Sequence, residues 1–189
     1  GYLPYIGDRH ICEFFSGYIT DPALMERFKL VRTTIQHREA LYNLTADRVR
    51  RWTNGEPTDQ PLDNTPSRET AADIIRAITF NRVFVDVVNT VNAGQIPSLP
   101  LGVVVETLGC VDAGGVTPLV LGEMPDKLNA LLVPHAYVQL WTAKAAVTGD
   151  LELALSALAA DPACACLAAG DVRKMGLELL EANNVRWPP

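Results

Sequence analysis

The sequence predicts an α+β fold, with long helices around a small, mainly antiparallel sheet. Helix-like segments come first, a short β-rich segment lies in the middle, and the remainder has helical character again. Elements segregated along the chain in this way are typical of α+β domains. The chain has 189 residues, of which 48% are apolar and 20% are charged. That length and composition favour a single domain with a substantial core.

The N-terminal third predicts one or two long helices from Pro22 to Trp52. Asp21 followed by Pro22 is a helix start, because Asp caps the free N–H groups and Pro fits the first turn. Apolar residues then recur at roughly helical spacing. Turn-forming residues dominate 53–66, and a loop of that length is either mobile or functional in a compact domain.

The middle of the chain predicts a helix followed by a small antiparallel sheet. Thr70-x-x-Asp73 has the form of a capping box, and it precedes an Ile-rich helical face. Strands are expected at 83–88 and 103–108, and a Gly-Gly turn leads into 117–121. From Met124 onward the chain reads as helical. Its expected caps and breaks are Gly149, Asp150, Gly170 and Asp171.

Composition excludes several classes of function. Acidic residues outnumber basic ones by 22 to 16 without any basic block, so nucleic acid is not an expected partner. No apolar run reaches the roughly 18 residues of a membrane span, and no signal-like N-terminus is present, so we expect a cytoplasmic protein. Cys110, Cys164 and Cys166 are expected to be reduced core thiols, whereas the role of Cys12, two residues from His10, is left open at this point. No Gly-x-Gly-x-x-Gly follows a strand, so the chain carries no dinucleotide phosphate loop of its own. Because the chain opens with Gly1, we expect a fragment of a longer protein.

The stretch most suggestive of chemistry is Gly-Asp-Arg-His-Ile-Cys-Glu-Phe-Phe at 7–15. Polar groups crowded between apolar and aromatic flanks are costly to bury unless they are paired or bound to something. A neutral imidazole is a common ligand of divalent metals, so His10 is the first candidate in this stretch. The alternative is a surface loop with a solvated His.

Collinear segments over nearly the whole chain resemble the C-terminal half of the NAD-dependent glycosidases of glycoside hydrolase family 4. Each segment is weak alone, but order and spacing hold for the set. The segments are the 7–15 motif, Ser67-Arg68-Glu69 with Asp73 to Ile78, Asn89-x-x-Asn92-x-Gly94-x-Ile96-x-x-Leu99-Pro100, Val104-Val105-Glu106, Gly122-x-Met124-Pro125, Ala146-x-Thr148-Gly149-Asp150, Ala154 to Leu158 and Asp161-Pro162.

The resemblance implies a domain like the C-terminal one of the lactate and malate dehydrogenase superfamily. An NAD-binding Rossmann domain, absent from this chain, would precede it. The implied reaction is an exception to two-carboxylate glycoside hydrolysis. NAD takes a hydride from the sugar C3, a base removes the acidified C2 proton, the glycosidic oxygen leaves by elimination, water adds and the hydride returns. A divalent metal, usually manganese, stabilises the charge that develops on O2 and O3.

The resemblance also implies roles for individual residues. His10 matches the metal-binding His of the family, whose Cys ligand lies upstream of residue 1, so Cys12 is assigned to packing. Asp8 or Glu13 would support the metal ligand, and Asp8 and Glu69 are the candidate catalytic carboxylates. The expected substrate-binding residues are Arg9, Arg68, Asn89 and Asn92. The alternative role of Arg9 is that of a salt-bridge partner. No residue of this chain is assigned to NAD.

Some of these residues have simpler interpretations. Asn89 and Asn92 either bind sugar hydroxyls or fix an Asx-type turn before Gly94. His37 is expected to be solvated, and His135 to be a packed helix histidine.

Two departures from the family pattern bear on the substrate. The branches that act on 6-phospho sugars have an Arg within the Asn-x-x-Asn segment and an aromatic pair before the next helix. Val91 and Thr70-Ala71 occupy those places here. A phosphate dianion would therefore lack its fork-shaped partner. We hypothesise an unphosphorylated substrate, a uronic acid whose carboxylate pairs with Arg68. The alternative is that Arg68 and Glu69 are solvated in the first turn of a helix.

Residues 1–189 are thus interpreted as the substrate- and metal-binding part of a family 4 glycosidase, inactive alone. A lactate or malate dehydrogenase shares the two-domain plan but lacks the 7–15 motif. The second alternative is a non-catalytic oligomerisation or sugar-binding domain without NAD or metal. Expected partners are a small-molecule glycoside, the missing Rossmann half and further copies of the chain, because Met124 to Gly149 is strongly apolar.

Overall fold

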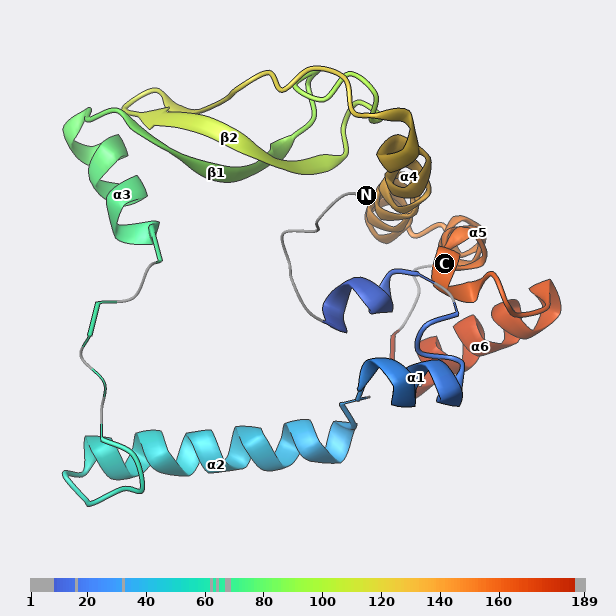
Figure 1. The fold of residues 1–189 in the computed structure, drawn as a ribbon, viewed down its shortest axis with the longest axis horizontal. Coiled ribbons are helices and arrows are strands. Elements are labelled where there is room, and N and C mark those ends of the chain that lie inside the picture. Colours follow the sequence, from blue (N-terminus) through green and yellow to red (C-terminus); the bar gives the residue numbers. More distant parts are fainter. Residues whose placement is uncertain are drawn as a thin grey trace. The chain divides into compact units, whose positions relative to one another are not determined.

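A computed structural model describes residues 9–15, 17–31, 33–61, 63, 65–66 and 69–185, with only the backbone described at Arg9 and His10. The chain divides into two compact units, one formed by 1–18 and 70–189 and the other by 19–69. The described residues form α-helices and one three-stranded antiparallel sheet (Figure 1). The predicted α+β class is confirmed. None of the described helices is long and apolar enough to cross a membrane.

The second unit contains two helices, α1 (Pro22–Phe28) and α2 (Ile35–Thr53). Asp21 caps α1 as predicted, since its carboxylate accepts a hydrogen bond from the Ala23 N–H at 2.8 Å. The left-handed conformation of Lys29 ends α1. Thr34 then caps α2. The helical region of 22–52 is therefore broken between the two helices.

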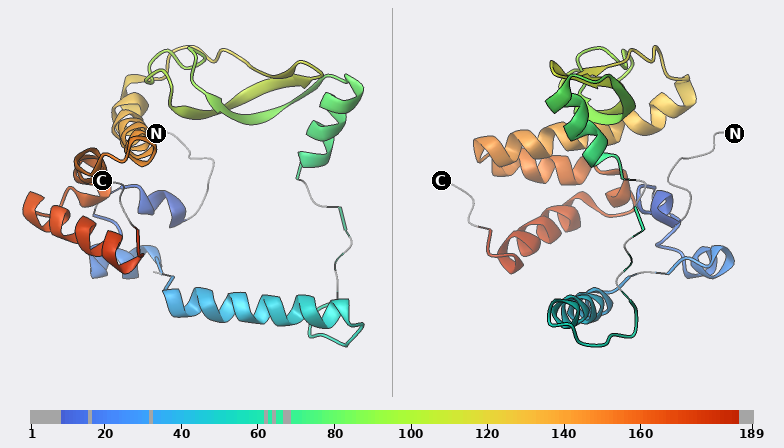
Figure 2. Two further views of the ribbon diagram at one scale, coloured as in Figure 1. Left: turned by 180° about the vertical axis from the view of Figure 1, so that it is seen from behind. Right: turned by 90° about the vertical axis from the view of Figure 1, so that its left-hand side faces the viewer.

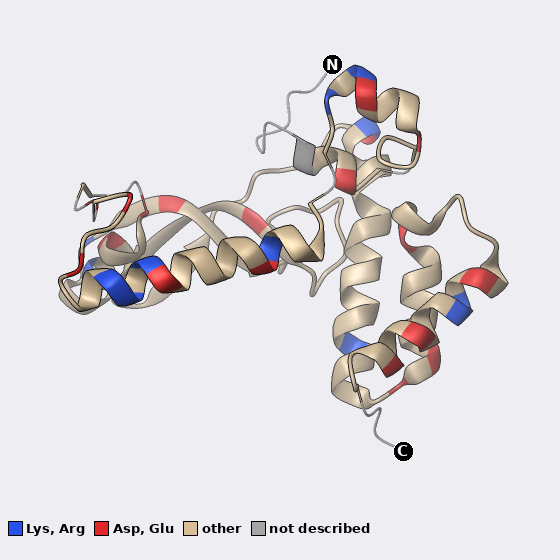
Figure 3. Ribbon diagram, turned by 90° about the horizontal axis from the view of Figure 1, so that it is seen from below, with Lys and Arg blue, Asp and Glu red and all other residues tan. Residues whose placement is uncertain are grey.

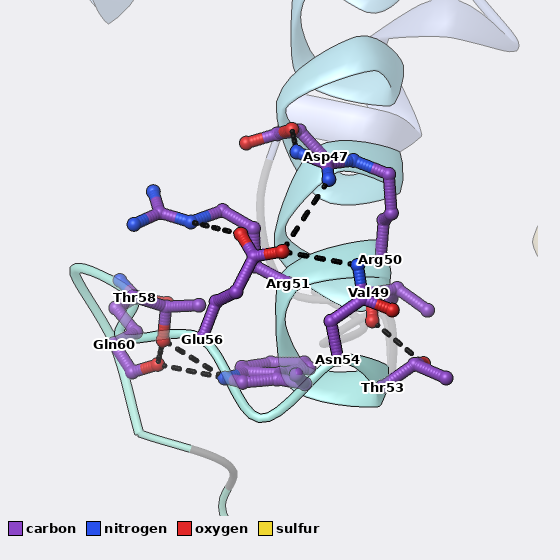
Figure 4. Close-up of polar contacts among 10 residues, drawn as sticks. Asp47, Val49, Arg50, Arg51, Thr53, Asn54, Glu56, Thr58 and Gln60 are labelled. Atoms are coloured by element: carbon purple, nitrogen blue, oxygen red, sulfur yellow. Dashed lines mark hydrogen bonds and ion pairs between the residues drawn. The ribbon is translucent and has the colours of Figure 1, made fainter.

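The start of the predicted long loop is folded against the C-terminal end of α2 (Figure 4). The Trp52 indole N–H donates to the Thr58 hydroxyl at 2.9 Å and to the Gln60 carbonyl at 3.1 Å. Arg48 makes a two-pronged contact with Asp59 at 3.2 and 2.9 Å, which lowers the pKa of that carboxyl. Residues 54–60 are thus bound to the helix by side chains, which sequence composition did not indicate.

The first unit is built on the sheet, in the order β1 (Phe84–Val91), β2 (Val104–Asp112) and β3 (Gly115–Pro118). β1 continues three residues beyond the predicted strand end, because Asn89, Thr90 and Val91 pair with Glu106, Val105 and Val104. Alternate side chains of β1 and β2 face a covered side, where helix α3 (Ala71–Phe80) packs. The core there consists of Ala77, Val88 and Val111, with Ile74 and Phe84 at its edge.

Helix α4 (Asp126–Thr148) closes the other end of the sheet (Figures 1 and 2). The buried residues of this second core are Ile96, Val103, Val105 and Ala136. No charged residue lies between Lys127 and Lys144, so α4 has a long uncharged stretch, whereas α2 carries both signs of charge (Figure 3).

The remaining helices are α5 (Leu151–Ala160), a 3-10 turn at Pro162–Cys164 and α6 (Ala169–Ala182). Asp150 caps α5 as predicted, accepting from the Leu153 N–H at 2.9 Å. The predicted cap at Asp171 is wrong. Helix α6 begins earlier, after Ala168, which leaves Asp171 inside the first turn.

Gly176 allows α6 to approach α5 closely. A Cβ at Gly176 would lie 2.6 Å from Leu155 Cδ2 and 3.0 Å from Leu158 Cδ2, whereas a Cβ at Gly170 on the same helix would meet nothing within 4 Å. Both Gly→Ala changes gain helix propensity, but only the one at position 176 overpacks the interface. We expect Gly176→Ala to be about 1–2 kcal/mol less stable than Gly170→Ala in chemical denaturation. Equal stability of the two variants would mean that Leu155 and Leu158 move aside without a loss of packing energy.

Candidate functional site

The segment that carries His10 forms a short 3-10 helix, η1 (Arg9–Glu13), closed by a hydrogen bond from the Phe14 N–H to the Ile11 carbonyl at 3.2 Å. Asp8, a candidate catalytic carboxylate, lies outside the described residues, as do the side chains of Arg9 and His10. Glu13 ends the turn and is exposed. The structure therefore gives the local conformation of this segment, and the metal and substrate roles of its side chains stay predictions.

Two aromatic residues connect η1 to helix α4. The rings of Phe14 and Phe15 each lie with centroids 5.9 Å from the His135 ring, at interplanar angles of 83° and 88°. Such edge-to-face geometry is favourable for aromatic pairs. His135 Nε2 is buried and has no hydrogen-bond partner among the residues that the structure describes. His135 was predicted to be a packed helix histidine, and its ring contacts agree with that prediction. The unpaired Nε2 was not predicted.

A second group lies where α3 begins. Arg68 is outside the described residues, and Glu69 is exposed immediately before Thr70. Thr70 occupies the capping position of α3, but its side chain makes no capping hydrogen bond, so the predicted capping box is wrong. The Thr70 hydroxyl instead bonds to Asp86 on β1 and, together with the Val87 N–H, lowers the pKa of that carboxyl.

Asp86 was missed by sequence reasoning. The available signal was one carboxylate within the Val-rich run at 83–88. It lies on the covered side of β1 opposite Gly109, where a Cβ would meet Val88 Cγ2 at 2.4 Å. Because hydrogen bonds from the Thr70 hydroxyl and the Val87 N–H hold the Asp86 carboxylate in its ionised form, Asp86 is a further candidate functional residue at the α3 end of the sheet.

A third group organises the loop that follows β1. Asn92 is 1% exposed. Its Nδ2 donates to the carbonyls of Ile96, Leu99 and Pro100 at 3.0, 3.0 and 3.1 Å. Its Oδ1 accepts from the N–H groups of Gly94 and Ile96 at 3.2 Å each. These contacts agree with the prediction that Asn92 fixes an Asx-type turn. Both the oxygen and the nitrogen of its amide bind the backbone of the loop.

Gln95 completes the same loop and was not anticipated from the sequence. It is 4% exposed, its Oε1 accepts from the Ala93 N–H at 2.7 Å, and its Nε2 donates to the Thr90 hydroxyl and the Val91 carbonyl at 3.2 and 2.9 Å. With Asn92 it satisfies polar groups that a buried loop would otherwise leave unpaired. The loop is therefore rigid, and the Ser98 hydroxyl, which accepts from the Met124 N–H at 3.2 Å, connects it to the start of α4.

Asn89 differs from Asn92 in its environment. It is exposed in β1 and pairs with Glu106 of β2. Its side chain faces away from the covered side on which Asp86 lies, because neighbouring strand positions alternate. Asp86 and Asn92 are separated by six residues of extended chain, about 20 Å. The described residues thus form an α3 group and a loop group at opposite ends of the sheet.

The described side chains contain no group of three or more His, Cys, Asp and Glu residues able to hold a metal ion. The four cysteines, Cys12, Cys110, Cys164 and Cys166, are free thiols, and the exposure of Cys166 shows that its assignment to the core is wrong. Cys166 is exposed, and burial raises the pKa of the Cys164 thiol.

Comparisons with known proteins identify the domain. The sequence model of the family described as the family 4 glycosyl hydrolase C-terminal domain matches residues 1–164. The chain is 32% identical over 183 residues to an alpha-galacturonidase of Thermoanaerobacterium saccharolyticum, covering 96% of this chain but only 38% of that protein. It therefore spans well under half the length of this relative.

Solved structures show the same fold. The crystal structure of LplD from Bacillus subtilis aligns with a TM-score of 0.79 at 27% identity, over 94% of this chain and 39% of that one. A 6-phospho-alpha-glucosidase from gut microorganisms, in complex with NAD and Mn²⁺, aligns with a TM-score of 0.68 at 19% identity, over 90% of this chain and 39% of that one. The second likeness shows the fold alone. The sheet, its flanking helices and the match over residues 1–164 together show that this chain belongs to glycosyl hydrolase family 4, as a C-terminal domain of that family.

Proposed function

We propose that the full-length protein containing this chain is a glycosidase that cleaves an O-glycosidic bond by NAD-assisted oxidation at C3, elimination and addition of water. The observation that carries the proposal is the family match over residues 1–164, which includes the 7–15 motif. NAD would be bound by a Rossmann half that this chain does not contain. A divalent metal would supply charge stabilisation at the sugar oxygens, with His10 as one of its ligands.

The catalytic and substrate-binding roles are proposed as follows. Glu69 and Asp8 are proposed as candidate proton-transfer carboxylates, and Arg9 and Asn89 as substrate contacts. Asn92 is proposed to act on the substrate through the loop that it holds, because both ends of its amide are occupied by that loop. The domain without its partner half is proposed to be inactive.

The substrate is proposed to be an unphosphorylated uronic acid glycoside. Three observations support this. Val91 is 56% exposed where the 6-phospho branches have an Arg, the Thr70 hydroxyl is bonded to Asp86 where those branches have an aromatic residue, and a relative is named alpha-galacturonidase. Arg68 would pair with the substrate carboxylate through its planar fork.

Paired substrates test this proposal. We expect the full-length protein, given NAD and Mn²⁺, to prefer a nitrophenyl galacturonide over the matching 6-phospho glycoside by at least about 100-fold in kcat/KM, equivalent to roughly 2.7 kcal/mol. Arg68→Gln should remove most of that preference. Arg76→Gln is the matched control, since Arg76 lies exposed on α3 with Asp73 as its ion-pair partner at 3.7 Å. Preference for the phosphorylated substrate would refute the uronide assignment.

We also propose that the protein forms a homo-oligomer. Helix α4 exposes several large apolar side chains within its uncharged stretch, among them Leu131, Leu132 and Tyr137. Exposed apolar patches on a helix commonly mark association surfaces. A monomeric mass in light scattering would contradict this proposal.

A further inference from the structure

The unit formed by 19–69 has no core among its described residues. None of these described residues is buried, and α2, its longest helix with 19 residues, contains no buried residue either. A helix in a folded protein gains most of its stability by packing an apolar face against another element. The side-chain contacts between α2 and the loop at 54–60 lie at the C-terminal end of the helix (Figure 4). The earlier turns of α2 therefore present a face that another surface has to cover.

The apolar residues of this face form a stripe along one side of α2. Ile35, Tyr42 and Val49 follow one another at intervals of seven residues, and each is at least half exposed. Successive members of such a series are displaced around the helix by only about 20°. Three further exposed residues flank the stripe on the same side: Arg38, Leu41 and Thr45. A seven-residue repeat is the spacing at which one helix packs along another.

The size of this face fits an interface between two proteins. Burial of a side chain of this size removes roughly 100 Å² from water, so the six side chains present about 600 Å² per copy. Two such faces packed together would bury about 1,200 Å², which is the lower limit for specific, stable interfaces.

We propose that this face of α2 is a contact between two copies of the chain, with the two helices antiparallel about a two-fold axis at Tyr42. The stripe is symmetric about Tyr42, since Ile35 and Val49 lie seven residues on either side of it. The axis places Tyr42 against its own counterpart and Ile35 against Val49 of the second copy. Contacts between identical subunits related by a two-fold axis have to be self-complementary in this way.

This inference rests on the proposed homo-oligomer and assigns it a contact separate from α4. The choice of a second copy as the occupant follows from the symmetry of the stripe. A different partner would need a matching surface of its own, whereas a second α2 supplies apolar side chains at the same intervals.

The test places a charge at the centre of the face in the full-length protein. Tyr42→Glu and Tyr42→Lys each bring two like charges together across the axis, whereas a mixture of the two variants brings opposite charges together. Leu44→Glu is the matched control, because Leu44 is exposed on the same helix but lies about 200° around it from Tyr42. Light scattering gives the mass of each sample, a dilution series gives its Kd for self-association, and thermal unfolding gives its melting temperature.

We expect each Tyr42 variant to raise the Kd for self-association at least about thirtyfold, as the loss of a central aromatic anchor does. The mixture of Tyr42→Glu and Tyr42→Lys should regain most of the wild-type affinity, which also shows that the single variants are folded. Leu44→Glu should keep the mass and the Kd of the wild type.

The contrary outcomes separate this inference from the proposals on which it depends. An oligomeric wild type whose mass is unchanged in both Tyr42 variants would overturn the α2 contact and leave the homo-oligomer to another surface. A lower melting temperature with unchanged mass would mean that the face packs against another part of its own chain, which overturns the α2 contact as well. Loss of association without recovery in the mixture would overturn the two-fold arrangement at Tyr42. A monomeric wild type would overturn both the α2 contact and the homo-oligomer, while the glycosidase proposal would stand on its own substrate test.

Discussion

Replacing His10 by Ala in the full-length protein is expected to weaken Mn²⁺ binding by at least about 100-fold and to reduce glycosidase turnover in parallel. Loss of groups that merely support metal ligands costs 10–100-fold in affinity, so removal of a ligand itself should cost at least the upper end of that range. Isothermal titration with Mn²⁺ measures the first effect, and turnover of the nitrophenyl galacturonide measures the second.

His37→Ala is the matched control for this change. His37 is exposed in the first turn of α2, where its backbone N–H donates to the Thr34 hydroxyl. It should leave Mn²⁺ affinity and turnover at wild-type values. Equal Mn²⁺ affinity in His10→Ala and wild type would remove the metal role of His10, and a wild type without measurable Mn²⁺ binding would favour the alternative of a non-catalytic domain.

Replacing Asn92 by Ala is expected to lower the free energy of unfolding by about 3–5 kcal/mol. The change leaves three carbonyls and two N–H groups of the loop without their partner, in a position that is 1% exposed. Each unpaired buried group costs about 1–3 kcal/mol, and water reaches some of them after the truncation. Chemical denaturation measures the difference.

Two further variants make the result specific. Asn92→Asp keeps the shape of the side chain but places a carboxylate oxygen against three carbonyl oxygens, so it should be at least as destabilising as Asn92→Ala. Asn89→Ala, at an exposed position of the preceding strand β1, should change stability by no more than about 0.5 kcal/mol. If Asn92→Ala raised KM without loss of stability, the side chain would be binding sugar rather than holding the loop.

Local signals were sufficient for much of the fold. Asp21 and Asp150 cap their helices as predicted, because a cap needs only a short polar side chain next to N–H groups two or three residues away. The two main strands were recognisable from their β-branched residues, since those side chains suit a pleated surface. The same local logic was wrong at Thr70 and Asp171. The Thr70 hydroxyl bonds to Asp86 on β1 instead of capping α3, and α6 begins one turn before its predicted cap.

The candidate site was less accessible to prediction from sequence. The family motifs indicated His10, Arg68 and Asn92 together, but did not separate a residue that holds a loop from one that meets a ligand. Only the contacts of Asn92 make that distinction, because its amide is saturated within nine residues of chain. Gln95 and Asp86 were overlooked because each has partners that depend on how strands and loops close.

What the sequence determined by itself is the α+β class, the order of its elements and the family, since periodicity, caps and collinear motifs are written in neighbouring residues. Only the tertiary structure decided which polar side chains find their hydrogen-bond partners within the fold and which do not. Contacts such as His135 with Phe14 and Phe15 join residues that are far apart in sequence. Their formation depends on how the helices and strands pack together, and no local pattern specifies that packing.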